Sequence, residues 1–159
     1  MLLDDVAALS LAQLSFKPAP TEWSILEVVQ HLVLSERSVM CGMPDLGALI
    51  ERRPTLRQYM SYPVVLLVLG YSIPFRTPSP EMVPDGRPTL PELRAQWAEN
   101  HRWLQRYIDS LTPRSARRAV FYHPIAGPIS VRQTLTMAHL HLTTHTRQIE
   151  ALKQAVTTL

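Results

Sequence analysis

The chain has 159 residues, of which 46% are hydrophobic and 18% are charged, a composition that indicates one globular domain over 1–159 and excludes a disordered chain. The net charge of +3 comes from scattered Lys and Arg residues, and without basic stripes interleaved with aromatic residues a nucleic-acid partner is not expected. The single cysteine, Cys41, excludes an internal disulfide, fits a reducing cytoplasm and is expected to be a small buried residue.

Four capping-box patterns mark expected helix starts. A Ser or Thr followed three residues later by Glu or Gln can satisfy the free backbone amides at a helix N-terminus. The four pairs are Ser24 with Glu27, Thr55 with Gln58, Thr89 with Glu92, and Ser130 with Gln133. Each pair precedes a stretch with helical apolar spacing, so each pair predicts the start of a helix.

In the first half of the chain, a short helix is expected over 3–14 and a long helix over 24–41. Residues 46–72 are predicted to be irregularly helical, because Pro54 and Pro63 interrupt the pattern. This proline-interrupted middle is longer than a tight connection between two helices needs, so it could form a lid or a dimer surface.

The most apolar run of the chain, YPVVLLVLGY at 62–71, lies in this middle region and contains Pro63 and Gly70. A helix that crosses a bilayer needs roughly 20 apolar residues. The run is therefore predicted to be a buried or interface segment, and no membrane association is expected.

In the second half, residues 73–88 carry five prolines and are predicted to form a loop. A helix is expected over 90–111, a loop over 112–129 with a short extended piece at RAVFYH, and a final helix over 130–156. The sequence shows no alternation of strands and helices. We therefore predict an all-α fold, an antiparallel helical bundle with an irregular middle.

The final helix contains HLHLTTHTRQI at 139–149, which holds three histidines. Each helical residue advances about 100°, so His141 and His145 project from one face about 40° apart, whereas His139 points about 160° away from His141. Two imidazoles one turn apart can bind one transition-metal ion. The alternative is that they are ordinary polar residues of a helix surface or a partly buried face.

His31, in WSILEVVQHLVLSE, is the candidate for a third ligand, although a lone core histidine is the alternative. With His141 and His145 it would supply three nitrogens and leave coordination positions open, as in catalytic metal sites. Glu27, one turn before His31, is either the capping-box acid or a group that orients His31. Gln148, one turn after His145, either lines the site or makes a polar core contact.

The other candidate residues have structural interpretations. His101 is expected to be exposed, His123 to lie in a loop, and Trp23 to anchor the start of the second helix. The sequence contains no glycine-rich phosphate loop, no Cys-x-x-Cys pair and no nucleophile elbow. The histidines therefore carry the functional hypothesis.

Two segments, PAPTEWSILEVVQHLVLSE and YHPIAGPISVRQTLTMAHLHLTTHTRQIEAL, resemble the two signatures of the DinB/YfiT-like superfamily in order and spacing. The resemblance implies an up-down-down-up four-helix bundle, often dimeric. It also implies a divalent metal ion (zinc, nickel or iron) bound by His31, His141 and His145. Two features depart from the pattern: the first helix is short, and Thr144 stands where many relatives have a further histidine.

Members of this superfamily with assigned activities include thiol-dependent S-transferases and metal-dependent hydrolases. The resemblance therefore implies a metal-dependent enzyme that acts on a small molecule, with a low-molecular-weight thiol or water as the nucleophile, and it implies a homodimer. The alternative is a non-catalytic bundle that binds a metal or small molecule, as a sensor or a dimerising module. A third interpretation is that the histidines pack in the core without a metal.

Overall fold

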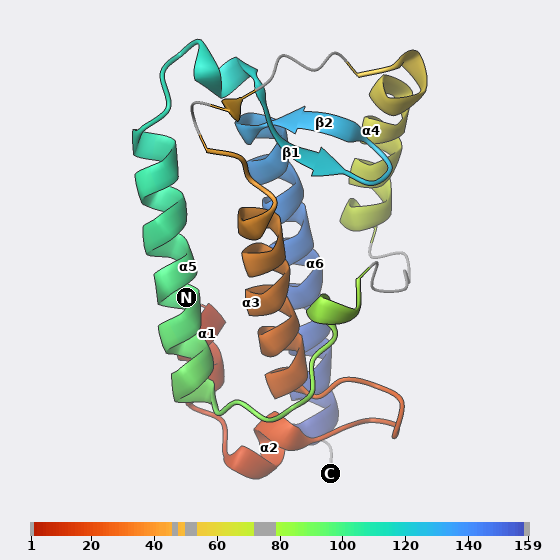
Figure 1. Ribbon diagram of the computed structural model, residues 1–159. Coiled ribbons are helices and arrows are strands. Elements are labelled where there is room, and N and C mark those ends of the chain that lie inside the picture. Colours follow the sequence, from red (N-terminus) through yellow and green to blue (C-terminus); the bar gives the residue numbers. More distant parts are fainter. Residues whose placement is uncertain (1, 46–47, 50–53, 72–78, 158–159) are drawn as a thin grey trace.

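The computed structural model describes residues 2–45, 48–49, 54–71 and 79–157. Its four long helices are α3 (Ile25–Cys41), α4 (Leu56–Gly70), α5 (Leu90–Asp109) and α6 (Val131–Thr157). Helix α3 lies between α5 and α6, whereas α4 packs against α6 at the edge of the molecule (Figure 1). No helix within these described ranges is long and apolar enough to cross a membrane.

The predicted capping boxes form at the starts of the long helices. At α3, the Ser24 hydroxyl accepts a hydrogen bond from the Glu27 amide, and the Glu27 carboxylate accepts one from the Ser24 amide at 2.8 Å. The same reciprocal pairs form at α4 and α6, and before α5 the Glu92 carboxylate accepts a hydrogen bond from the amide of Thr89, the N-cap residue. These local bonds explain why the helix starts could be predicted from the sequence.

Helix α3 forms the centre of the main core. Every side chain from Ile25 to Val33 is buried, as expected for a helix that is apolar on most of its circumference. It packs against Leu93 and Trp97 of α5 and against Ile149 of α6. A second cluster, at the end where α5 and α6 meet the strands, contains Leu49, Tyr107, Val120 and Val131.

The N-terminal segment forms two helices, so the prediction of one helix over 3–14 is wrong. Helix α1 covers Leu2–Ala7 and α2 covers Leu11–Ser15. Ser10 starts α2 through a fifth capping box with Gln13, and this box breaks the continuous helix. The side chains of Val6 and Leu14 are buried in the main core, so both short helices contribute to it.

A two-stranded antiparallel sheet replaces most of the loop predicted over 112–129. Strand β1 (Ala119–His123) pairs with β2 (Gly127–Ser130), which confirms the extended piece but corrects the all-α assignment. The buried side chains of Val120 and Ile129 hold the hairpin against the bundle. Gly127 has a φ of 71°, and a Cβ at this position would overlap the Gln58 side chain, so the turn requires glycine.

Two predictions for the middle of the chain can be compared with the described residues. Helix α4 is the only long helix in the described part of the predicted middle region, and it continues through Pro63, so the interruption predicted at Pro63 is wrong. Residues 46–47, 50–53 and 72 lie outside the described residues. The loop predicted over 73–88 contains the 3₁₀ helix η2 (Pro80–Met82) in its described part, and 73–78 lies outside it.

Cys41 is exposed, so its predicted burial is wrong; it lies in the last turn of α3, beyond the buried part of that helix. Helix α4 runs parallel to α6, because Tyr62 contacts Gln133 and Leu69 contacts Thr144 further along both helices. The up-down-down-up order implied by the resemblance stays a prediction.

Candidate metal centre

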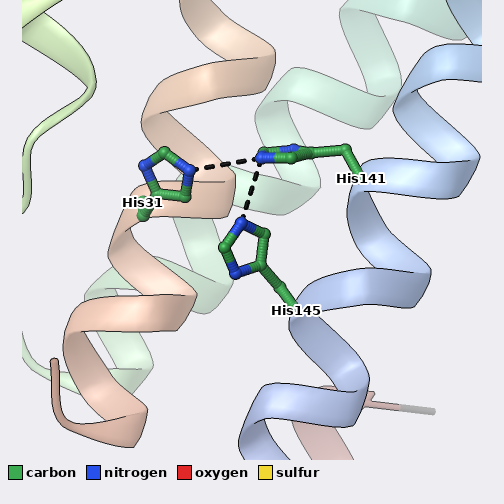
Figure 2. A group of neighbouring side chains, drawn as sticks. All are labelled: His31, His141 and His145. Atoms are coloured by element: carbon green, nitrogen blue, oxygen red, sulfur yellow. Dashed lines mark hydrogen bonds between the residues drawn. The ribbon is translucent and has the colours of Figure 1, made fainter. Parts of the chain in front are cut away.

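The three predicted histidines meet between α3 and α6. Their ligand nitrogens lie within 4.8 Å of one another, and no other group of His, Cys, Asp or Glu in the described part of the chain could hold a metal ion. His141 Nε2 lies 3.2 Å from His31 Nε2 and 3.1 Å from His145 Nε2 (Figure 2). The helix α6 supplies two imidazoles from adjacent turns, and α3 supplies the third from the opposite side.

His31 is oriented by a backbone carbonyl. Its Nδ1 lies 2.8 Å from the Met82 oxygen in η2. A carbonyl oxygen only accepts, so Nδ1 carries the proton and donates it to Met82. In the neutral imidazole the lone pair is then on Nε2, the atom that faces His141.

His145 is oriented in the same way by a side chain. Its Nδ1 donates to Gln148 Oε1 at 2.8 Å, so its Nε2 also carries a lone pair directed at His141. This contact confirms that Gln148 lines the site. A hydrogen bond from the non-ligating nitrogen to a carbonyl or carboxylate oxygen is the usual support for a metal-binding histidine.

The chemistry of this donor set fits a cation. His141 Nε2 has two imidazole lone pairs within 3.2 Å, and a single proton on it can satisfy only one of them. One metal ion accepts all three lone pairs. With metal–nitrogen bonds of about 2.0–2.1 Å, tetrahedral coordination separates neighbouring ligand nitrogens by about 3.3 Å, which matches the two shorter separations.

The electrostatic environment keeps the three imidazoles neutral. Burial lowers the pKa of His31 to about 4, with a smaller effect from the neighbouring His145. Burial and the two neighbouring histidines lower the pKa of His141 to about 3, and burial also lowers that of His145. Neutral imidazole is the form that coordinates a metal ion, so at neutral pH no proton competes for the site.

Trp23 and Ser35 lie beside His31. The Trp23 ring centroid is 4.8 Å from that of His31, and Trp23 packs against the main core, which confirms it as an anchor at the start of α3. Ser35, one turn after His31, is buried with its hydroxyl 3.5 Å from His31 Nε2. This serine was not selected from the sequence, since a lone Ser four residues after a His carries no specific signal.

Glu27 acts as the capping-box acid and not as a support for His31. One carboxylate oxygen accepts from the Ser24 amide and the other accepts from Lys17 Nζ at 2.7 Å. These contacts hold the pKa of Glu27 below its ordinary value despite its burial. One alternative for Glu27 was that it orients His31. The Met82 carbonyl orients His31 instead.

The loop that carries Met82 is fastened to α3 by Gln30. Its Nε2 donates to Asp85 Oδ1 at 2.7 Å, and its Oε1 accepts from the Gly86 amide at 2.9 Å. Gly86 adopts a φ of 69°, which a residue with a side chain would rarely adopt. Gln30 therefore holds the loop whose Met82 carbonyl orients His31, a positioning role that could not be found from the sequence because its partners lie more than fifty positions away.

The remaining histidines lie away from the centre. His101 is exposed, as predicted, and its Nε2 lies 3.4 Å from Glu36 Oε2. His139 is also exposed and does not belong to the cluster. His123 ends β1 and accepts hydrogen bonds from the Ile125 and Ala126 amides through Nδ1, so its placement in a loop is wrong. It stabilises the hairpin turn.

Comparison with known proteins agrees with this arrangement. The model of the DinB superfamily matches residues 1–149. The solved structure of YfiT from Bacillus subtilis, described as a probable metal-dependent hydrolase with an unusual four-helix bundle topology, is similar with a TM-score of 0.60 at 21% identity, over 98% of this chain and 79% of YfiT. No match was found among curated proteins. The likeness to YfiT shows a shared bundle fold, and the family match covers nearly the whole chain; the chain belongs to the DinB superfamily.

Proposed function

We propose that the protein is an enzyme that binds one divalent metal ion through Nε2 of His31, His141 and His145 and uses it to activate a nucleophile against a small-molecule substrate. The observation that carries the proposal is the orientation of His31 and His145, whose proton-bearing nitrogens are engaged by Met82 and Gln148. Both lone pairs therefore face the shared point where His141 also lies.

Three protein ligands leave coordination positions for a nucleophile and a substrate, as in catalytic zinc sites. When bound, the metal ion supplies Lewis acidity that lowers the pKa of a coordinated water or thiol towards neutrality. The residues of the chain supply the rest: Met82 and Gln148 hold the imidazole rings in place, and Trp23 covers one side of His31. The Ser35 hydroxyl is close enough to contact a ligand beside His31 Nε2.

Hydrolysis is the reaction we favour, with water as the nucleophile, because YfiT is described as a probable metal-dependent hydrolase. Transfer of a low-molecular-weight thiol is the second candidate. It is supported by the resemblance of the two histidine-bearing segments to superfamily members with thiol-dependent S-transferase activity. We place either reaction in a reducing cytoplasm. The chain's sole cysteine, the exposed Cys41, fits that compartment.

The first test is the metal content of tag-free protein, measured by plasma mass spectrometry after incubation with zinc, nickel or iron(II). We expect one ion per chain in the wild type and its loss in His141→Ala. His139→Ala is the matched control, because this exposed histidine lies on the same helix outside the cluster. A wild type that binds none of the three ions would contradict the proposal.

The second test compares the two reactions with the metal-loaded protein. Ester and amide substrates are offered with water alone, and electrophilic substrates are offered with a low-molecular-weight thiol. Product formation that depends on both the metal and His141 identifies the reaction. A protein that holds the metal but turns over neither panel would instead be a binding module or sensor.

A further inference from the structure

A cavity lies between α4, the β1–β2 hairpin and the start of α6. Its volume is about 460 Å³, which is within the range of small-molecule sites in proteins. Gln58 of α4 joins two of its walls, because its Nε2 donates to the hydroxyl of Tyr122 in β1 at 3.1 Å. Figure 1 shows the turn of the hairpin beside α4. The cavity is therefore bounded by elements that are distant in the sequence and meet only in the folded chain.

The cavity is separate from the candidate metal centre. Helix α6 contributes Gln133 to its lining, and Gln133 lies about 12 Å before His141 along the helix axis and about 80° away from it around the axis. That side of α6 faces α4, because the Gln133 carbonyl accepts a hydrogen bond from Tyr62. None of the described lining residues belongs to the three-histidine cluster. Binding in this cavity therefore does not depend on the proposed metal chemistry.

Three side chains of the lining offer hydrogen-bond donors that no other described residue engages. They are the Tyr59 hydroxyl, the Arg117 guanidinium and Nε2 of Gln133. Gln133 Oε1 accepts from the Ser130 amide at 3.0 Å and from the Ser130 hydroxyl at 3.2 Å, which fixes the side-chain amide and leaves its Nε2 free to donate. By contrast, Tyr62 uses its hydroxyl within the fold. The unused groups can all donate, so they match a ligand that is rich in acceptors.

The charge of the lining favours an anion. Arg117, the last residue of the 3₁₀ helix η3 (Ser115–Arg117), is the only charged residue among the described residues of the lining, and none of them is a carboxylate. A guanidinium presents parallel N–H groups that fit the two oxygens of a carboxylate. One cation balances one negative charge, so a monocarboxylate fits the lining better than a dianion does.

The rest of the lining is largely apolar. Ala126 and Ile129 are each only 2% exposed, and Met60, Pro63 and Pro128 add further apolar surface. A ligand that covers these side chains gains free energy, because apolar surface is removed from water. The expected ligand therefore carries an apolar body beside its carboxylate.

We propose that this cavity is a binding site for a small organic monocarboxylate with an apolar body. The carboxylate accepts hydrogen bonds from Arg117, Tyr59 and Gln133, and the apolar body packs against Ile129 and Met60. The bound ligand contacts α4, η3, the hairpin and α6 together, so its binding stabilises the contact between α4 and the rest of the bundle.

The first test is isothermal titration calorimetry of the full chain with phenylacetate as the probe. Three comparison compounds each lack one feature: phenylacetamide has no charge, acetate has no apolar body, and benzylphosphonate is a dianion. We expect phenylacetate to bind at least about tenfold more tightly than each of them. Absence of phenylacetate binding at millimolar concentrations, or equal binding of phenylacetamide, would overturn the proposal. Equal binding of acetate would overturn the apolar part of the site, and tighter binding of benzylphosphonate would overturn the choice of a monocarboxylate.

The second test locates the ligand within the cavity. Gln133→Glu keeps an acceptor for Ser130, because Glu serves equally well in a capping box, but it replaces the free donor with a negative charge. Arg117→Gln removes the cation. We expect each variant to bind phenylacetate at least about tenfold more weakly than the wild type. Arg114→Gln is the matched control, since Arg114 is exposed in the same segment but does not line the cavity. Unchanged binding in both Gln133→Glu and Arg117→Gln would overturn the proposal.

The third test separates this cavity from the metal centre. Carboxylates also bind metal ions, so phenylacetate is titrated against His141→Ala as well. We expect unchanged affinity, with far-UV circular dichroism showing that this variant and those at Gln133 and Arg117 are folded. Loss of binding in a folded His141→Ala would place the carboxylate at the metal centre and overturn the proposal. Unchanged binding in a chain that takes up no metal would leave this proposal standing while the proposed function fails.

Discussion

Helices α3 and α4 share a local design but differ in their tertiary environment. Both are apolar, both begin with a reciprocal capping box, and they have 17 and 15 residues. Yet α3 is buried continuously from Ile25 to Val33, whereas no residue of α4 is buried. The difference teaches that a capping box and apolar composition determine where a helix begins, and that burial depends on which other elements pack around it.

The largest expected effect is the difference in the free energy of unfolding between two Leu→Ala variants, one in α3 and one in α4. Leu32→Ala in α3 removes a side chain that is 2% exposed, and we expect it to lower the free energy of unfolding by about 2–5 kcal/mol. Leu67→Ala in α4 removes one that is 57% exposed, and we expect it to lower the free energy of unfolding by about 0.5 kcal/mol or less. Urea denaturation of both variants measures the difference. An equal loss in the free energy of unfolding for the two variants would mean that the two side chains are equally packed, which would contradict the prediction.

The second prediction concerns the pH dependence of the metal-free protein. The folded-state pKa values of His31 and His141, about 4 and about 3, lie below the ordinary value of 6.5. Below pH 6.5 the unfolded chain therefore binds more protons, so the free energy of unfolding is highest above pH 6.5 and falls as the pH drops towards 4. We expect each of the two histidines to contribute a loss on the order of 3 kcal/mol, and both together on the order of 6 kcal/mol.

Urea titrations from pH 7 to pH 4 in the presence of a chelator measure this loss. The largest part of this loss comes from the region between α3 and α6, where His31 and His141 lie. Burial also lowers the pKa of His123 in β1, which contributes in the same direction, whereas α4 contains no acidic residue or histidine. A double variant with His31→Leu and His141→Leu should therefore show a much flatter profile. A wild-type profile as flat as that of the double variant would contradict the prediction.

The third prediction tests the support of His145. Gln148→Ala removes the acceptor for its Nδ1 proton, and we expect metal affinity to fall by about 10–100-fold. Gln148→Glu keeps an acceptor oxygen and should retain most of the affinity. Competition with a chromophoric chelator measures both, and Gln105→Ala on the exposed face of α5 is the control. Unchanged affinity in Gln148→Ala would mean that this hydrogen bond does not orient the ring.

The smallest expected effect comes from the two capping residues. Ser24→Ala removes the buried cap of α3, and we expect global stability to fall by about 1 kcal/mol. Thr55→Ala removes the exposed cap of α4, which can open while the core stays folded. We expect a smaller loss of global stability and faster hydrogen exchange of the first α4 amides. Equal losses of global stability would show that α4 unfolds together with α3.

The metal-ligand candidates could be predicted from the sequence more completely than their surroundings. His141 and His145 were paired by helical spacing alone, and the structure places their Nε2 atoms 3.1 Å apart. The Met82 carbonyl could not be predicted, because every residue has a carbonyl and only the position of η2 brings this one to His31. The split of the N-terminal helix follows from a local pattern, because Ser10 and Gln13 have the spacing of a capping box and form one at the start of α2.

By itself, the sequence determined the features that depend on neighbours within about one helical turn. These are the starts of the four long helices, the common face of His141 and His145, and the capping role available to Glu27. The tertiary structure alone decided the approach of His31 to that pair, the hairpin, and the contrast between buried α3 and exposed α4. The physical reason is range: a capping bond or an i,i+4 pair forms within one turn, whereas burial and long-range hydrogen bonds depend on segments that meet only when the whole chain is folded.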